Sequence, residues 1–485
     1  MRKFDLLTIL LLLLALALLS YSLDKPFWGQ FDWTGAWFGT IARNYLEIPL
    51  AKSRLAPITV AGTANRADWQ YYNHYSVAYP FLIAGSLLVF GDHEWSIRLV
   101  SLVFSLLMLG AFYVLCRRFF HPLVGIFGII VIIFSPMFVY YGKLPVHEQP
   151  VLFLSLVSLF YYLSWTHSAK RADFIKMFLS VILGFLISWT GGYILILMTL
   201  HLFYNQKFKA FLLTPFYLVL LLILALHLIH IYISSDMADF VQALAERTSG
   251  GVNTGKILFT PLSFLARQTR WFFVLYTRPV ALIVLLNFFS VLVVDIRRRA
   301  LSSGGQLLIV FFAWGFFQWL VVPRITWIHD YMLIYFLPFV GLSSGLLMKR
   351  IWDKNRSVGL VFCLFILVIS VVTSLPFTAA LLRSKDQTSR MYAVAKFLRK
   401  HTIYGDRILM AIKPGSEFEI HYPSHYLSYY SNRFVKYQFT NVHNKREEYK
   451  YIIVPQGEAD PELARLLREK YNETRINNFS LYEIR

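Results

Sequence analysis

The sequence predicts an α-helical polytopic membrane protein with a small soluble α/β domain at its C-terminal end. Of 485 residues, 57% are hydrophobic and only 15% are charged, whereas a soluble domain is nearer half apolar and a quarter charged. Apolar runs of membrane-spanning length recur up to residue 380, and more polar sequence follows. This pattern predicts about 11 transmembrane helices, since each crossing needs roughly 20 apolar residues.

The predicted spans follow one another with short gaps and two long interruptions. The first run comes after Arg2 and Lys3 without a small-residue cleavage site, which predicts an uncleaved helix. The fifth and sixth spans are short and are joined by Trp189–Gly192. The spans are 6–23, 95–116, 122–141, 150–166, 175–189, 191–204, 211–233, 279–295, 306–323, 329–348 and 357–378.

Basic residues set the predicted orientation. The net charge is +20, and clusters such as Arg117–Arg118 and Arg297–Arg299 fill short gaps that fall on one side of an alternating chain. The positive-inside rule assigns that side to the cytoplasm, which explains the excess without a nucleic-acid partner. We therefore expect a multi-pass protein of the cytoplasmic membrane, with a cytoplasmic N-terminus and an outer C-terminal domain. Cys116 and Cys363 form no disulfide or zinc motif.

The predicted organisation is a transmembrane domain over 1–380 and a soluble outer domain over 381–485. Large outer loops occupy 24–94 and 234–278. In the first, amphipathic stretches at 37–46 and 79–90 are expected to lie in the membrane interface. In the tail, the apolar spacing predicts helices over 389–400 and 461–471, strands over 406–412 and 449–454, and a hairpin or edge strand over 474–484.

Two acids next to predicted span ends are candidates for chemistry. Asp32 lies in an aromatic-rich segment after the first span, where a carboxylate can act as a general base or a hard metal ligand. A helix N-cap is the alternative, and local sequence alone favours it. Glu148 lies with His147 in the turn after the third span, where a first-turn acid favoured by the helix dipole is the alternative.

The pairing of these acids raises the weight of a catalytic interpretation. Both lie on the same predicted face, so two carboxylates and a histidine can hold a divalent ion such as Mg²⁺, Mn²⁺ or Zn²⁺ against a phosphate. His74 is a third candidate ligand, with an interfacial aromatic cluster as an equal alternative. Asp92, His93 and Glu94 are interpreted as the capping residues of a helix start.

A set of cationic and polar residues is predicted to bind the phosphate of a lipid. Ordinary anchoring to lipid headgroups is the alternative for each one. The set comprises Arg247, Lys256, Arg267 and Arg270 of the second outer loop, with Arg324, His329 and Tyr331 further along the chain.

Four groups of motifs follow one another along the chain: Asp32 with Ile41–Glu47, Asn73–Tyr75 with Tyr79–Phe81 and Phe90–Leu99, Ser135-Pro136 with Tyr140–Lys143 and His147-Glu148, and His329–Tyr331 before Leu337-Pro338. Their order resembles the C-type-fold (GT-C) membrane glycosyltransferases. The most similar branch contains the protein O-mannosyltransferases and the lipid A aminoarabinose transferase. The resemblance covers nearly the whole chain, with Trp33 where the family often has a second acid and Glu148 where many members have Asp.

This resemblance implies a function and roles for the candidate residues. The donor would be a polyprenyl-phosphate sugar, and a lipid, glycan or protein on the outer face would be the acceptor, with inversion. Asp32 would deprotonate or orient the acceptor hydroxyl, and Glu148, with His147 or His74, would bind a divalent ion or the donor phosphate. An Arg or Lys of the second outer loop would neutralise the leaving phosphate.

Other classes of protein remain open at this point. A transporter or flippase of a lipid-linked or small polar substrate is the main alternative, although it usually has ionisable groups at the bilayer midplane and internal repeats. Neither sign is evident in this sequence. A membrane scaffold and an enzyme that transfers a whole oligosaccharide are further alternatives, the latter disfavoured by the small tail.

Overall fold

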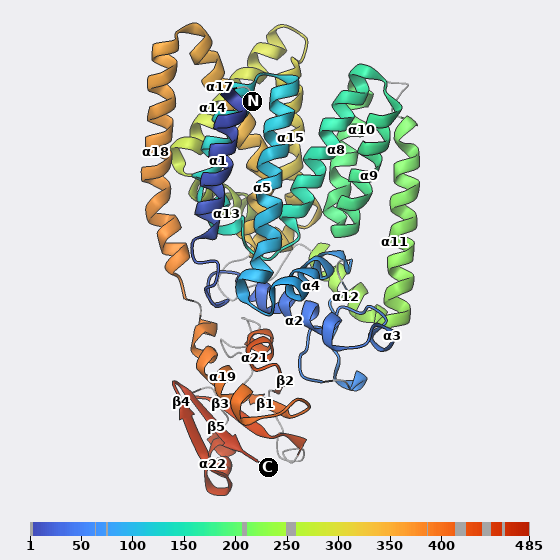
Figure 1. The fold of residues 1–485 in the computed structure, drawn as a ribbon, viewed down its shortest axis with the longest axis vertical. Helices are drawn as coiled ribbons and strands as arrows, with labels where there is room; N and C mark the ends of the chain where they lie inside the picture. The colour runs from blue at the N-terminus through green and yellow to red at the C-terminus, as the bar shows by residue number, and fades with distance from the viewer. Residues whose placement is uncertain are drawn as a thin grey trace.

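The computed structural model describes residues 3–63, 65–73, 76–205, 211–248, 259–385, 387–412, 423–438, 448–457 and 461–484. Long helices form a bundle, and a small domain with a β-sheet lies at one end of it (Figure 1). The chain begins at the opposite end of the bundle from this domain. We call the end of the bundle next to the sheet domain the domain-facing end.

A helix occupies each of the eleven ranges that the sequence predicts as spans. Several of these ranges hold more than one element: 122–141 is divided into α6 and α7, 175–189 runs from α9 into the 3-10 turn η2, 191–204 begins in η2, and 329–348 begins with the 3-10 segment η4. The helices are α1 (Lys3–Ser20), α5 (Glu94–Phe119), α6 (Pro122–Ile133), α7 (Pro136–Tyr141), α8 (Glu148–Ser168), α9 (Arg171–Ile187), α10 (Tyr193–Asn205), α11 (Thr214–Ser234), α14 (Arg278–Arg297), α15 (Ser303–Val321), η4 (Asp330–Phe336), α17 (Leu337–Lys354) and α18 (Arg356–Arg383), with η2 (Trp189–Gly192).

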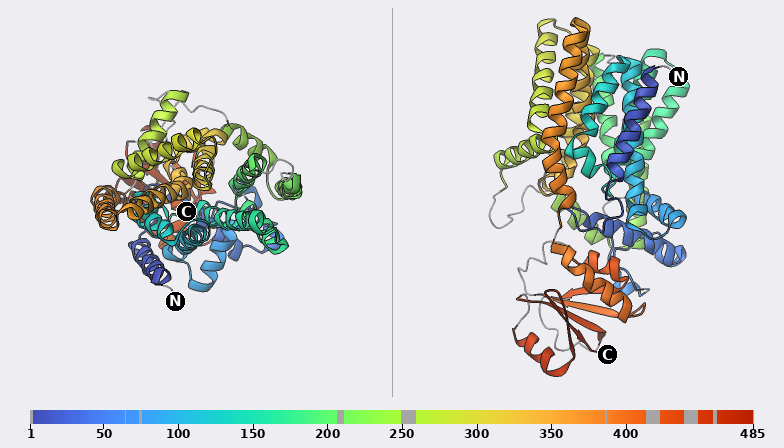
Figure 2. Two further views of the ribbon diagram at one scale, coloured as in Figure 1. Left: turned by 90° about the horizontal axis from the view of Figure 1, so that it is seen from above. Right: turned by 60° about the vertical axis from the view of Figure 1, so that its left-hand side comes forward.

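Seven helical segments of the described chain are long and apolar enough to cross a membrane. Further apolar helices are shorter, at Phe4–Ser20, Ala78–Phe90 and Pro122–Ile133. The number of about 11 spans and the orientation of the chain therefore stay predictions. The segment Asp330–Lys354 is the most enclosed, with 89% of its most apolar window buried, against 17% for Phe211–Ser234 and 22% for Arg356–Arg383. The last two lie at the edge of the bundle, as the end-on view shows (Figure 2).

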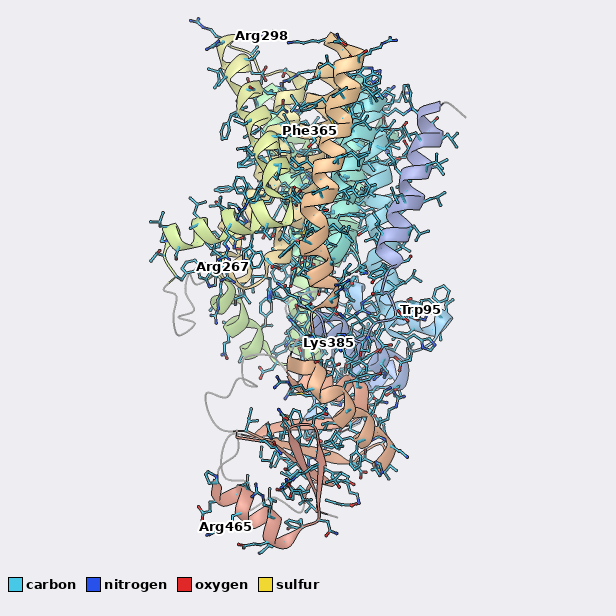
Figure 3. All side chains as sticks on the ribbon, turned by 90° about the vertical axis from the view of Figure 1, so that its left-hand side faces the viewer. Trp95, Arg267, Arg298, Phe365, Lys385 and Arg465 are labelled. Atoms are coloured by element: carbon cyan, nitrogen blue, oxygen red, sulfur yellow. The ribbon has the colours of Figure 1, made fainter. Side chains whose placement is uncertain are left out.

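Shorter helices lie toward the domain-facing end of the bundle and, for α13, at its side (Figure 3). Among them α2 is largely buried, because α4, α5 and α21 (Pro423–Ser431) pack against it. The position of 37–46 in the membrane interface stays a prediction. By contrast, α4 covers the other stretch predicted to lie in the interface, 79–90, and its apolar residues Leu88 and Val89 are 75% and 71% exposed. These helices are α2 (Trp33–Glu47), α3 (Leu50–Ser53), α4 (Ala78–Phe90), α12 (Met237–Thr248), α13 (Pro261–Leu275) and α16 (Pro323–Ile328), with the 3-10 turn η1 (Arg66–Asp68).

The C-terminal domain contains a five-stranded sheet of order β2-β1-β3-β5-β4. The pairs of β1 with β2 and with β3 are parallel, and the pairs of β5 with β3 and with β4 are antiparallel. The predicted helices, strands and closing hairpin of the tail are present, and α21 and β2 were not predicted. The elements are η5 (Gln387–Arg390), α19 (Met391–His401), β1 (Arg407–Ala411), α21 (Pro423–Ser431), β2 (Phe434–Gln438), β3 (Tyr451–Pro455), α22 (Pro461–Lys470), β4 (Glu473–Ile476) and β5 (Phe479–Glu483).

Alternating strand residues divide the core of this domain between two faces of the sheet. Leu409 and Ile452 pack with Leu463 and Leu467 of α22, whereas the neighbouring strand residue Ile408 belongs to the core that α19 and α21 share with the membrane bundle. Successive strand side chains point to opposite faces, which explains the division. Because α21 also contacts α2, the sheet domain is packed against the loop 24–94.

Candidate active site

Asp32 is buried at the domain-facing end of the bundle and is held by two hydrogen bonds. The residue is only 7% exposed. The Gly29 backbone N–H and the Arg98 guanidinium donate to Asp32 Oδ2 at 2.9 and 3.1 Å. Asp32 occupies the N-cap position of α2, but its side chain makes no cap hydrogen bond. The cap interpretation, which local sequence favoured, is therefore wrong for the side chain.

Arg98 connects this carboxylate to the first loop and to α5. The residue is 3% exposed, donates to the carbonyls of Leu23 and Lys25, and stacks on the Phe27 ring at 4.5 Å. Residues three or four apart share a helix face, and Ser101 and Ser105 follow Arg98 on α5. Ser105 Oγ donates to the Gly142 carbonyl at 2.6 Å, and Ser101 Oγ lies 3.4 Å from the Val146 carbonyl. One face of α5 thus holds both Asp32 and the turn before α8.

Two lysines add positive charge around Asp32. Lys143 is buried and donates to the Tyr21 carbonyl, and Lys25 donates to the Leu382 and Ser384 carbonyls at 2.7 and 2.9 Å. Burial, and then the charge of Arg98, lowers the pKa of Lys143 to about 8, while Asp32 opposes the shift. Burial likewise lowers the pKa of Lys25. These shifts mean that an added anion would be favoured here, because it would compensate buried positive charge.

A second buried acid, Asp330, lies on the other side of the same loop. It is 3% exposed and accepts hydrogen bonds from Tyr141 Oη at 2.8 Å and from Gln30 Nε2 at 2.9 Å. Tyr140, next to Tyr141, donates to the Gln30 carbonyl at 2.8 Å. Residues of α7 and η4 therefore fix the segment immediately before Asp32.

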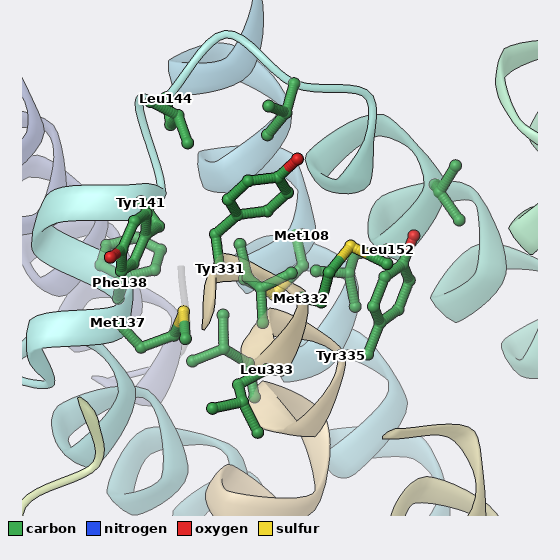
Figure 4. Packing of buried hydrophobic residues seen from close by; sticks show 14 of the residues in the cluster. Met108, Met137, Phe138, Tyr141, Leu144, Leu152, Tyr331, Met332, Leu333 and Tyr335 are labelled. Atoms are coloured by element: carbon green, nitrogen blue, oxygen red, sulfur yellow. The ribbon is translucent and has the colours of Figure 1, made fainter. Parts of the chain in front are cut away.

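Aromatic contacts connect His329 and Tyr331 to the residues next to Asp32 in the sequence. Phe31 contacts both rings, at 5.4 and 5.3 Å between centroids, and Trp33 contacts His329 at 6.0 Å. Figure 4 shows Tyr331 and its neighbours in η4 packed beside Tyr141 and Phe138 of α7. The two predicted phosphate-binding residues thus contact the residues on either side of Asp32 in the sequence.

Arg267 lies close to this group on α13, which projects from the side of the bundle (Figure 3). Its guanidinium stacks on Trp327 at 4.8 Å and its Nε has no hydrogen-bond partner among the described residues. Burial lowers the pKa of Arg267, and the charge of Asp330 opposes that shift. A half-buried guanidinium with unused donor capacity is suited to bind an anion.

The other predicted phosphate-binding residues are less closely tied to Asp32. Arg270 is exposed on α13 and interacts electrostatically with Arg267. Arg324 is half-buried on α16, which packs against α13. Arg247 lies in α12, and its side chain falls outside the described part of the structure, as do Lys256 and His74.

Glu148 and His147 begin α8 and are both buried. His147 Nε2 lies 3.3 Å from Glu148 Oε1, and the His147 ring is 6.4 Å from that of Tyr79. Tyr79 Oη in turn lies 2.9 Å from Ser101 Oγ on the α5 face that carries Arg98. The two predicted acids, Asp32 and Glu148, therefore border the same face of α5. Glu148 also lies in the first turn of α8, the position that a stabilising interaction with the helix dipole would require.

A divalent ion does not fit the immediate surroundings of Asp32. Its carboxylate is already paired with Arg98, and Lys25 and Lys143 add charge that would repel a cation. Within the described ranges, no group of three His, Cys, Asp or Glu side chains is placed to hold a metal.

The helix start predicted at 92–94 is present, because α5 begins at Glu94 with His93 at its N-cap, but no side-chain cap hydrogen bond is formed there. Asp92 forms an ion pair with Arg43 at 2.8 Å. Glu94 accepts a hydrogen bond from Tyr430 at 3.1 Å. The side chains of Asp92 and Glu94 therefore join the start of α5 to α2 and to the C-terminal domain.

Comparison with known proteins matches these features to one fold. Residues 74–233 match the family model described as dolichyl-phosphate-mannose-protein mannosyltransferase. No curated protein sequence matches the chain. The crystal structure of ArnT from Cupriavidus metallidurans bound to undecaprenyl phosphate superposes with a TM-score of 0.60 at 12% identity, covering 98% of this chain and 97% of that one. This chain has the GT-C fold.

An archaeal protein extends the likeness within the GT-C fold. The Archaeoglobus fulgidus oligosaccharyltransferase, in complex with Zn and sulfate, matches with a TM-score of 0.58 at 13% identity, covering 98% of this chain and 73% of that one. The resemblance stated from the sequence motifs is confirmed at the level of fold. None of the matches described here supports a transporter.

Proposed function

We propose that this GT-C protein transfers a sugar from a polyprenyl-phosphate donor to a hydroxyl of a lipid, glycan or protein acceptor, with inversion at the anomeric carbon. The observation that carries the proposal is the buried Asp32 carboxylate inside a cluster of Arg98, Lys143 and Lys25. One acid and several cations are what transfer from a phosphate ester requires. The acid, in its carboxylate form, accepts the proton of the nucleophile as a general base, and the cations stabilise the leaving phosphate.

The bond changes assign a role to each part of the site. The acceptor oxygen forms a bond to the anomeric carbon while the bond from that carbon to the phosphate oxygen breaks. The acceptor proton passes to Asp32, and the polyprenyl phosphate leaves with the bonding pair. Lys143 and Arg267 are the proposed phosphate ligands, with His329 and Tyr331 beside the sugar and Arg98 orienting Asp32. Arg270, Arg324, Arg247 and Lys256 remain predicted to attract the phosphate from further out.

The burial of Lys143 near Asp32 favours phosphate binding over anchoring to ordinary lipid headgroups. Lys143 is buried, so it cannot reach a bulk headgroup layer as a snorkelling side chain does. Its lowered pKa reflects desolvation that a bound phosphate would relieve. The matched ArnT structure contains undecaprenyl phosphate, a ligand of the class proposed here.

A metal-assisted variant of the reaction rests on Glu148, His147 and His74. The pairing of Glu148 with His147 is the part of this prediction that the structure describes. Their chemistry would suit Mg²⁺, Mn²⁺ or Zn²⁺ next to a phosphate. Addition of a chelator to the transfer assay tests it, since full activity in excess chelator would exclude a dissociable ion.

The direct test is sugar transfer by purified protein from a panel of radiolabelled polyprenyl-phosphate sugars to a native membrane extract. We expect transfer from at least one donor, release of free polyprenyl phosphate in equal amount, and loss of both in Asp32→Asn. Donor turnover without Asp32 would refute the assigned base. Uptake of a donor into vesicles without cleavage would favour the flippase alternative instead.

A further inference from the structure

A tyrosine of the C-terminal domain ties the catalytic loop to the start of α5. Tyr430 lies in α21 and is 7% exposed. Its hydroxyl accepts a hydrogen bond from the Phe27 backbone N–H at 2.8 Å and donates one to Glu94 Oε1 at 3.1 Å. Both the hydroxyl proton and an oxygen lone pair are therefore used, and the bonds join three segments that are far apart in sequence.

The two ends of this connection lead to Arg98. Phe27 lies under the Arg98 guanidinium at 4.5 Å from ring centroid to Cζ, and Phe27 is fully buried. Glu94 precedes Arg98 by four residues on α5, so both side chains share one helix face. Arg98 then bonds Asp32. Displacement of Phe27 or of the first turn of α5 would change the position of Arg98 and hence of the carboxylate.

Neighbouring contacts hold α21 in place independently of this hydroxyl. Arg43 of α2 donates to the Tyr429 carbonyl at 2.8 Å and stacks on its ring at 4.4 Å. The Ser428 hydroxyl accepts from the Ala61 N–H at 3.0 Å. Removal of one oxygen atom from Tyr430 should therefore leave the docking of the domain intact.

We propose that Tyr430 is a positioning residue that holds the loop 24–32 so that Arg98 presents Asp32 to the acceptor. The inference rests on the proposed function for its catalytic readout. It makes the C-terminal domain part of the catalytic unit and not an appended acceptor-binding module. Tyr430 contacts no reacting atom, so its effect must appear as a loss of turnover and not of donor binding.

The structure offers a matched control on the same helix. Tyr426 lies one turn before Tyr430, is fully buried, and its hydroxyl has no hydrogen-bond partner in the part of the chain that the structure describes. Tyr426→Phe and Tyr430→Phe therefore make the same chemical change at similar depth. Only the second one breaks hydrogen bonds to the loop and to Glu94.

The experiment combines hydrogen exchange with steady-state kinetics on the full-length protein. Tyr430→Phe is expected to speed amide exchange in peptides that contain 24–32, because the Phe27 N–H loses its acceptor. It should lower kcat by up to about 100-fold, the effect of misplacing a reacting group by roughly 1 Å. KM for the donor should stay near that of Tyr426→Phe. The thermal unfolding midpoint should fall below that of Tyr426→Phe, because only Tyr430→Phe leaves the buried Phe27 N–H without its acceptor.

The two readouts separate this inference from the proposed function. Equal exchange and equal kcat in the two variants would overturn the inference while wild-type transfer upheld the function. Faster exchange with unchanged kcat would overturn the positioning role as well. If wild-type protein transferred no sugar, the function would fail, and the exchange comparison would still show whether Tyr430 holds the loop.

Discussion

Replacement of Asp32 by Asn separates the catalytic role of this side chain from a structural one. Asn has nearly the same shape and keeps one oxygen that accepts from the Gly29 N–H. It removes the negative charge that faces Arg98. Because Asp32 makes no cap hydrogen bond to α2, the substitution does not uncap the helix.

The structural cost follows from what Arg98 retains. Removal of one partner of a buried ion pair costs about 3–5 kcal/mol when the other charge is left alone. Arg98 keeps its bonds to the carbonyls of Leu23 and Lys25 and its contact with Phe27. The expected loss is therefore nearer the worth of one charge-assisted hydrogen bond, about 2 kcal/mol. A protein of ordinary stability, about 5 kcal/mol or more, stays roughly 99% folded after such a loss.

The catalytic cost is much larger. A positioned general base contributes about 10²–10⁴-fold to the rate, so transfer should fall by at least about 100-fold while membrane abundance stays unchanged. Asp24→Asn is the matched control, because Asp24 is an exposed acid of the same loop. Transfer within a factor of about two of wild type in Asp32→Asn would refute the base assignment. Loss of folded protein would restore a structural role.

Three further substitutions test the surroundings of Asp32. KM for the donor should rise above about pH 8, because Lys143 loses its proton there. Lys143→Arg should remove this rise, because arginine stays charged. A wild-type KM that is constant up to about pH 9 would contradict the assignment of Lys143 to the phosphate. Arg267→Ala should lower kcat/KM for the donor roughly 10- to 150-fold, since a charge-assisted bond is worth about 1.5–3 kcal/mol, and unchanged kcat/KM would remove Arg267 from the site. Tyr141→Phe leaves the buried Asp330 carboxylate without its bond from Tyr141 and should lower the free energy of unfolding by about 1–3 kcal/mol. An unaltered denaturation midpoint would show that Asp330 finds another donor.

The sequence was most informative where the membrane imposes length and composition. Each predicted span contains a helix because a backbone in lipid must satisfy its own hydrogen bonds. The break between α6 and α7 was not predicted, because Ser135-Pro136 interrupts an apolar run that continues on both sides. The 3-10 segment η4 was missed for a similar reason: its composition is as apolar as that of the helix it precedes.

The residues around Asp32 were harder to predict because their contacts are long-range. Arg98 is 66 residues from Asp32, and Asp330 is 189 residues from Tyr141 and 300 from Gln30. A single arginine or lysine at the end of an apolar run has the pattern of a headgroup anchor, so the sequence alone assigns no role to Arg98 or Lys143. The signal that could have identified Lys143 is its place in the same turn as Glu148, within a run otherwise free of charge.

The helix packing beneath the site provides a prediction that does not depend on catalysis. Gly341 and Gly345 of α17 form a small-xxx-small pattern, which lets membrane helices approach closely. A Cβ at Gly345 would lie 2.2 Å from the Val124 carbonyl oxygen of α6. Since this neighbour is backbone, a methyl group there must push the two helices apart.

Gly345→Ala should therefore lower the thermal unfolding midpoint, although alanine is favoured over glycine in a helix interior by about 1 kcal/mol. Gly110→Ala in α5 is the matched control, because nothing lies within 4 Å of its added Cβ. It should be neutral or stabilising. Gly345→Ala should also lower the transfer activity. The reason is that α6 leads into α7, which carries Tyr141, and α17 continues η4, which carries Asp330. If Gly345→Ala were as stable and as active as Gly110→Ala, the close contact of α6 with α17 would not be what aligns these two residues.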